Sequence, residues 1–251
     1  MIPKIIHYCW FGSNPLPESA KRCIESWRKY LPDYEIKEWN ETNIDVNLIP
    51  YTAQAYAAKK YAFVSDYIRF KVLYEFGGIY FDTDVEVIKP FDRIIEDGSF
   101  MGFEENPSLK NGNAFKGNVN PGLGMGAISG LGLFEEVIKK YNNMYFINED
   151  GSLNQKTVVE YTTKILVKHG LTNVQGIQHI AGVNIYPAEY FNPLNDNTGR
   201  LNITKNTYSV HWYSKSWINE HPLRRKLSRL SHRILGTKLV PSIKRWVKSF
   251  F

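Results

Sequence analysis

The chain opens with a strand, a helix and a second strand in close succession, and this order constrains its fold more than any other feature. Residues 2–10 are apolar and rich in β-branched and aromatic side chains, which predicts a buried strand. Residues 17–31 carry apolar side chains at helical spacing between Pro17 and Pro32, which predicts a helix. Residues 34–39 alternate Tyr and Ile with Glu and Lys and predict another strand. This opening is typical of an α/β sheet.

Later segments mix helices and strands. We expect further helices over 51–61, from a cap at Ser65 to Phe76, over 131–144 and over 157–169, and further strands over 79–81, 85–88, 99–104, 123–129 and 208–213. The order favours a three-layer α/β sandwich. The chain of 251 residues is long enough to bury a core without disulfides, and its two cysteines, Cys9 and Cys23, fit no disulfide or zinc pattern. We therefore expect two buried thiols.

Composition and charge divide the chain into a body and a tail. Hydrophobic residues make up 43% and charged residues 22%, which excludes a disordered chain, a coiled coil and a collagen-like repeat. Residues 1–220 carry 22 basic against 25 acidic side chains, whereas residues 221–251 carry nine basic and no acidic ones. We expect a catalytic domain over 1–220 and a separate basic tail over 221–251.

The tail has the pattern of basic amphipathic helices. Its first apolar stripe has helical spacing among arginines and lysines, and a second apolar set with terminal aromatic residues follows Gly236; the first stripe is Leu223, Leu227, Leu230 and Ile234. Such helices suit an anionic membrane surface, so we expect peripheral binding to the cytoplasmic face of the cell membrane. The alternative is a helix docked on the body. We expect no signal peptide, because residues 1–10 lack a basic region followed by a long apolar one. We expect no membrane-spanning helix, because the longest charge-free stretch, 117–134, contains six glycines and a proline.

Two carboxylates follow a short buried strand. Asp82 and Asp84 flank Thr83 directly after residues 79–81, where they can reach one hard cation from a turn. A carboxylate pair holds Mg²⁺ or Mn²⁺ best when substrate phosphates complete the coordination shell. Such a cation neutralises a leaving diphosphate. The sequence therefore predicts a metal site at Asp82 and Asp84.

Further polar and aromatic groups could complete a site. Asp66 and Arg69 are three residues apart on the preceding helix, either as a surface pair or as groups that project over Asp82 and Asp84. His211 could be a third metal ligand, and the Ser, Lys and Trp side chains after it could donate to a diphosphate. Trp10 could form a platform for a base, or could simply pack in the core. A glycine-rich run over 122–127 is interpreted as a close-approach loop lining a site.

The run from Ser65 to Phe70, with Leu73 and Tyr74, and the run from Gly77 to Asp84 closely resemble the DXD sugar-binding region of glycosyltransferase family 32. That family includes bacterial capsule and lipopolysaccharide transferases and Golgi mannosyltransferases, and the glucosylating clostridial toxins share the region. Residues 2–12 resemble the family's first strand, and residues 211–217 resemble its closing motif.

The resemblance implies a GT-A fold with a mixed sheet, Mn²⁺ or Mg²⁺ as cofactor, a nucleotide-sugar donor and retention of configuration by a hexosyltransferase. A bacterial cytoplasmic setting would favour a UDP-sugar and a glycan or lipid-linked glycan acceptor in surface polysaccharide synthesis. By motif position, the donor and metal residues are Asp66 and Arg69 beside Tyr80 for the sugar, Asp82 and Asp84 for metal and ribose, His211 for metal, Trp10 and Gly12 near the base, and Ser216 and Trp217 at the diphosphate.

Two other classes of function compete with this interpretation. A phosphohydrolase that uses the first carboxylate as nucleophile would carry Thr or Val where this chain has Glu86, and would carry a later Asp pair. A nucleic-acid-binding protein would fit the pI of about 9.1, but residues 1–220 are net acidic. We therefore expect no nucleic-acid partner.

Overall fold

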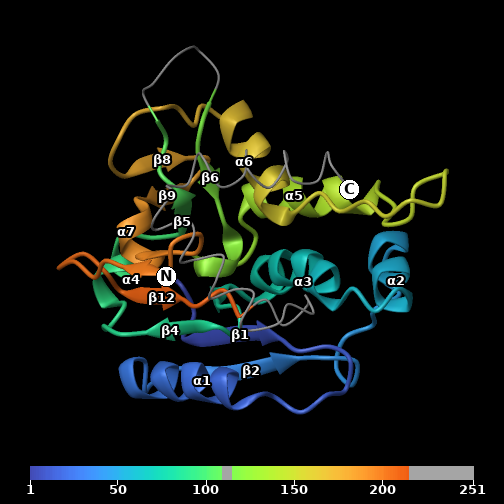
Figure 1. Ribbon diagram of the computed structural model, residues 1–251, viewed down its shortest axis with the longest axis horizontal. Helices are drawn as coiled ribbons and strands as arrows, with labels where there is room; N and C mark the ends of the chain where they lie inside the picture. The colour runs from blue at the N-terminus through green and yellow to red at the C-terminus, as the bar shows by residue number, and fades with distance from the viewer. Residues whose placement is uncertain (109–114, 215–251) are drawn as a thin grey trace, which may run out of the picture.

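The computed structural model describes residues 1–108 and 115–214 (Figure 1). Its helices are α1 Glu18–Tyr30, α2 Pro50–Ala57, α3 Tyr61–Phe76, α4 Asp92–Glu96, α5 Gly132–Asn142, α6 Val158–Lys168 and α7 Ala188–Phe191, with a 3₁₀ turn η1 at Pro121–Leu123. Its strands are β1 Ile5–Cys9, β2 Glu35–Trp39, β3 Gly78–Tyr80, β4 Val85–Val87, β5 Phe100–Glu105, β6 Asn118–Val119, β7 Met125–Ala127, β8 Gln178–Ile180, β9 Val183–Tyr186, β10 Leu194–Asn195, β11 Arg200–Leu201 and β12 Ser209–His211.

The central sheet is mixed. Its strand order is β2-β1-β3-β7-β5-β9-β8, with β6 also paired to β5. The pairs β1/β2, β1/β3 and β5/β9 are parallel, and the other neighbouring pairs are antiparallel. A separate two-stranded ribbon joins β4 to β12, and this ribbon becomes important for the site.

Helices cover both faces of the sheet, so each strand alternates its side chains between two cores. Ile6 and Tyr8 of β1 face a core with α1, α4 and α7, whereas Cys9 faces a second core with α2, α3, α5 and α6. In β5, Phe100 faces the first core and Met101 the second. Figure 1 shows the same layering around β1, with α1 below it and α3 above it. The predicted α/β/α sandwich with a mixed sheet is confirmed.

Two predicted boundaries are wrong for a local reason. The helix α3 begins at Tyr61, not at Ser65, and the Ser65 hydroxyl donates to the Tyr61 carbonyl within the helix, 3.2 Å away. The predicted strand over 123–129 is shortened to β7, because η1 precedes it. Gly77 follows α3 with φ 65°, which a glycine accommodates without strain.

The remaining expectations divide between the described and the undescribed parts of the chain. Both thiols, Cys9 and Cys23, are free and buried. Within residues 1–108 and 115–214, none of the helices has the length and apolar character required to span a bilayer. The basic tail, and with it the boundary near residue 220, lies outside the described residues.

Candidate active site

The two carboxylates of the site lie on the turn between β3 and β4. This turn is held at its start by the Phe81 amide, which donates to the His7 carbonyl of β1 at 3.1 Å. It closes through the Val85 amide, which donates to the Asp82 carbonyl at 3.0 Å. Asp82 and Asp84 therefore leave the end of a central, buried strand, as the sequence predicts.

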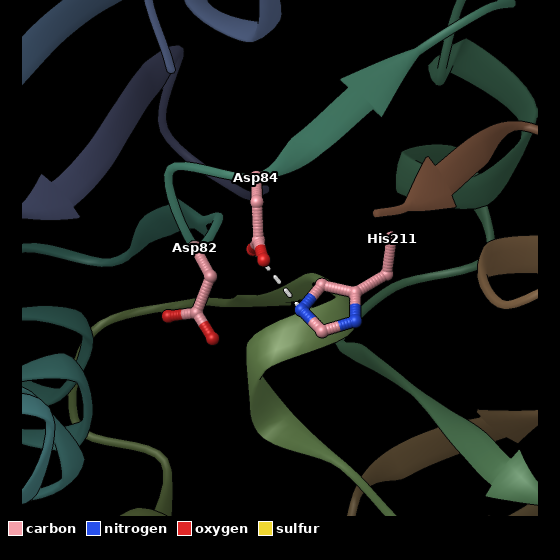
Figure 2. A group of neighbouring side chains, drawn as sticks. All are labelled: Asp82, Asp84 and His211. Carbon is pink, nitrogen blue, oxygen red and sulfur yellow. Dashed lines mark ion pairs between the residues drawn. The ribbon is translucent and has the colours of Figure 1, made fainter. Parts of the chain in front are cut away.

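His211 reaches the carboxylates through strand pairing. It ends β12, which runs antiparallel to β4 and places His211 opposite Val85. Its Nε2 lies 3.1 Å from Asp84 Oδ1, and Figure 2 shows the imidazole turned toward the two carboxylates. Asp82, Asp84 and His211 each offer one possible ligand atom, and these three atoms lie within 4.8 Å of one another. Two carboxylates and an imidazole are a donor set that fits Mn²⁺ or another divalent cation.

The electrostatics of this cluster are dominated by the contact between Asp84 and His211. Burial raises the pKa of Asp84, but His211 and the amide and hydroxyl of Ser214, 2.7 and 3.0 Å from Oδ2, outweigh burial and hold that pKa well below its usual range. Burial lowers the pKa of His211, but Asp84 outweighs this and the pKa is raised. Asp84 is therefore ionised at neutral pH, as a cation ligand must be.

Asp66 and Arg69 join this cluster from α3. Both residues are buried, at 8% and 4% exposure, so the surface-pair alternative is wrong. One guanidinium nitrogen of Arg69 lies 3.1 Å from Asp66 Oδ1 and 3.2 Å from Asp82 Oδ1. The Tyr80 hydroxyl also donates to Asp82 Oδ1, at 3.1 Å, and its ring lies beneath Arg69. These contacts link the predicted sugar-binding residues to the predicted metal site.

The glycine-rich run packs directly against Asp82. The Asp82 amide donates to the Gly122 carbonyl, and a Cβ at Gly122 would lie 2.1 Å from Asp82 Oδ2. Asn120 holds the turn by accepting from the Gly122 amide at 2.8 Å. A side chain here would require the Asp82 carboxylate to move, which supports the interpretation as a close-approach loop.

The roles of the other four predicted donor residues stay predictions. Trp10 and Gly12 are in the loop after β1, where the Trp10 indole donates to the Asn14 carbonyl at 2.6 Å and the Gly12 amide donates to Glu41 at 2.5 Å. These hydrogen bonds hold the loop internally and against the chain that follows β2. Ser216 and Trp217 lie outside the described residues, so their role stays a prediction.

Sequence reasoning missed one carboxylate near the cluster. Glu104, near the end of β5, accepts a hydrogen bond from the Tyr213 hydroxyl at 3.0 Å. Its charge also raises the pKa of His211, although less than Asp84 and Asp82 do. In the sequence, only the acidic pair Glu104 and Glu105 at the end of the predicted strand hints at a functional role for Glu104. Its approach to His211 cannot be seen locally, because it depends on strands far apart in the chain.

Comparisons with known proteins agree with the resemblance. Residues 17–101 match the family described as a glycosyltransferase sugar-binding region containing a DXD motif. Inositol phosphoceramide mannosyltransferases 3 and 1 of Schizosaccharomyces pombe are 32% and 26% identical over 106 and 116 residues, which cover 38% and 40% of this chain. The matched parts span 27% and 33% of those relatives, which is about a third of their length or less.

Two solved glycosyltransferases match this chain with TM-scores below 0.5. PaToxG glycosyltransferase has a TM-score of 0.46 and 20% identity, and the match covers 66% of this chain and 69% of that one. A glycosyltransferase involved in glycosylation of the major capsid of PBCV-1 has a TM-score of 0.44 and 13% identity, with 90% of this chain and 98% of that one covered. The match to the family model alone confirms the resemblance to the DXD glycosyltransferases over residues 17–101, the part of the chain that holds Asp66, Arg69, Asp82 and Asp84.

Proposed function

We propose that the protein is a metal-dependent glycosyltransferase that moves a hexose from a nucleotide-sugar to a glycan acceptor. The observation that carries this proposal is the continuous contact from Asp66 through Arg69 to Asp82, beside Asp84 and His211, within a DXD sugar-binding region. The relatives named as mannosyltransferases support transfer of a hexose. UDP as the nucleotide and a lipid-linked acceptor remain part of the proposal.

Each group has a separate task in this scheme. Asp82, Asp84 and His211 would hold Mn²⁺ or Mg²⁺, which when bound neutralises the charge that develops on a leaving diphosphate. Arg69 is fixed by two carboxylates, so it keeps Asp82 in place, and Asp66 and Arg69 are assigned to the donor sugar. Fixed groups of this kind stabilise charge without reorganising during the reaction.

The stereochemical course is proposed from the resemblance alone. Retention needs either a nucleophile on the β face of the sugar or attack from the same face as the leaving group. The two routes stay open, because neither the sequence nor the contacts of the described residues single out a nucleophile. The anomeric configuration of the product, measured by proton NMR, tests retention directly.

The cation assignment is tested by Asp84→Asn. We expect this variant to fold and to lose roughly 10²-fold or more in release of nucleoside diphosphate from a panel of UDP- and GDP-hexoses, because one charge that holds the cation is removed. Asp33→Asn is the matched control, since Asp33 is an exposed carboxylate in a surface ion pair with Lys4. EDTA should abolish activity and Mn²⁺ should restore it.

Three outcomes would contradict the proposal. Asp84→Asn could retain full activity, the wild type could be fully active in EDTA, or no nucleotide-sugar on the panel could be turned over. Release of phosphate from a phosphate monoester by the wild type would instead favour the phosphohydrolase.

A further inference from the structure

Tyr213 has a backbone conformation that non-glycine residues rarely adopt. It follows His211 by two residues, and its φ is 51°. Left-handed conformations of this kind cost on the order of 1–3 kcal/mol and persist only where the surroundings fix them. The contacts of Tyr213 are therefore expected to hold this backbone conformation in place.

The Tyr213 hydroxyl is fixed by two elements outside the β4–β12 ribbon. It donates to Glu104 Oε1 of β5 at 3.0 Å and accepts from Asn192 Nδ2, just after α7, at 2.7 Å. The same Asn192 nitrogen donates to the Glu104 carbonyl at 3.1 Å.

The Tyr213 ring in turn lies edge-on against His211. The ring centroids are 4.2 Å apart and the planes make an angle of 75°. On its other side, the imidazole contacts Asp84 through Nε2. Its second nitrogen, Nδ1, is buried and has no hydrogen-bond partner among the described residues.

This arrangement differs from the usual way in which a metal-binding histidine is oriented. Such a histidine normally donates its outer N–H to a carboxylate or carbonyl, which fixes the ring. Within residues 1–108 and 115–214, no such group meets Nδ1, so the ring is oriented by its Nε2 contact with Asp84 and by packing against Tyr213.

We propose that Tyr213, anchored by Glu104 and Asn192, is a positioning residue that turns His211 Nε2 toward Asp82 and Asp84 to receive a divalent cation. The proposal rests on the proposed function in one respect, that the cluster binds a cation. It goes beyond that function by assigning the orientation of the ligand to an aromatic contact and its anchor.

The test is Mn²⁺ binding to the full chain, measured by the EPR signal of free Mn²⁺, without substrate. Loss of groups that orient a metal ligand typically weakens metal binding about 10–100-fold. We expect that weakening in Tyr213→Leu, which removes the ring edge. Tyr213→Phe keeps the ring but loses the anchor, so an intermediate weakening is expected. Tyr30→Phe, at the end of α1, is the matched control and should bind as the wild type does.

Thermal unfolding separates positioning from stability. A purely structural role would lower the melting temperature and leave Mn²⁺ affinity unchanged in the folded variants, and that result would overturn the inference. If Tyr213→Leu fails to fold, Tyr213→Phe and Glu104→Ala decide, because each removes the hydrogen bond between the Tyr213 hydroxyl and the Glu104 carboxylate and keeps the ring. If both of these variants bind Mn²⁺ with the affinity of the wild type, the inference is overturned.

Failure of the proposed function gives a different result. If the wild type itself binds no Mn²⁺, the cation assignment is wrong, and the inference falls with it. If the wild type binds Mn²⁺ and Tyr213→Leu, folded, binds it equally, only the role of Tyr213 is wrong.

Discussion

Asp66 is an acid held in an environment that disfavours its charge. Burial raises its pKa to about 6, with Arg69 opposing this and Asp82 adding to it. In an unfolded chain an aspartate has a pKa of about 3.9. Stability contributed by this group is thus complete below about pH 4 and is lost as the pH rises through about 6. A buried, destabilising carboxylate fits a group retained to bind a ligand.

Asp66→Asn should separate binding from stability. The amide keeps the shape without the buried charge, so at pH 7.5 we expect an unfolding free energy equal to the wild type or up to about 3 kcal/mol higher. The gain should disappear near pH 4. Turnover of the nucleotide-sugar should fall at least about tenfold, since a charged hydrogen bond to the donor is lost.

Urea unfolding at both pH values and turnover, measured on the same preparation, check this prediction. Asp150→Asn, in an exposed turn, is the control. A large loss of stability together with normal turnover would show that Asp66 is structural.

At the scale of elements, β3 and its two flanking turns set the geometry of the site. His7 of β1 donates from Nε2 to the Gly77 carbonyl at 2.9 Å and accepts from the Trp39 indole at 3.0 Å. Burial lowers the pKa of His7 to about 4, so the ring is neutral at neutral pH and can accept this hydrogen bond. The start of β3 is thereby tied to β1 and β2. At the other end, the Gly122 turn closes on Asp82.

Gly122→Ala is expected to displace the Asp82 carboxylate. A Cβ at 2.1 Å from Asp82 Oδ2 cannot be accommodated without movement, and overpacking of this kind costs typically about 1–3 kcal/mol. We expect at least about tenfold weaker Mn²⁺ binding and a lower melting temperature. Gly132→Ala is the matched control, because a Cβ there meets nothing within 4 Å. Unchanged Mn²⁺ affinity in Gly122→Ala would contradict the packing argument.

At the scale of the whole molecule, the site gathers residues from distant parts of the chain onto one end of the sheet. The helix α3 supplies Asp66 and Arg69, the β3–β4 turn supplies Asp82 and Asp84, and β12 supplies His211. The basic tail begins shortly after β12, at residue 221. We therefore keep as a proposal that the tail binds the cytoplasmic face of a membrane and that the acceptor is lipid-linked.

Vesicle co-sedimentation tests this proposal. Full-length protein should pellet with anionic vesicles at low salt and less with neutral ones, because each basic residue near an anionic surface contributes about 1 kcal/mol. A chain ending at Glu220 should lose this binding. Equal binding of both chains, or no binding of the full chain at low salt, would show that the tail is not a membrane anchor.

The sequence alone was sufficient for features that depend on neighbours along the chain. Apolar periodicity located β1, α1 and β2 to within a few residues, because helix and strand periods are local properties. The same holds for Asp82 and Asp84 at the end of a buried strand, since the strand and the carboxylates are adjacent. The start of α3 was misplaced because Ser65 favours a cap in isolation, whereas its hydroxyl bonds within the helix here.

Only the tertiary structure decided which distant groups meet. Spacing of three residues on a helix is the same for a surface pair and for a buried one, so the packing of α3 on the sheet had to decide the role of Asp66 and Arg69. His211 meets Asp84 because β12 pairs with β4, and Glu104 approaches them because β5 ends nearby. Pairing and register of strands far apart in the chain depend on burial across the whole core, and no local pattern encodes them.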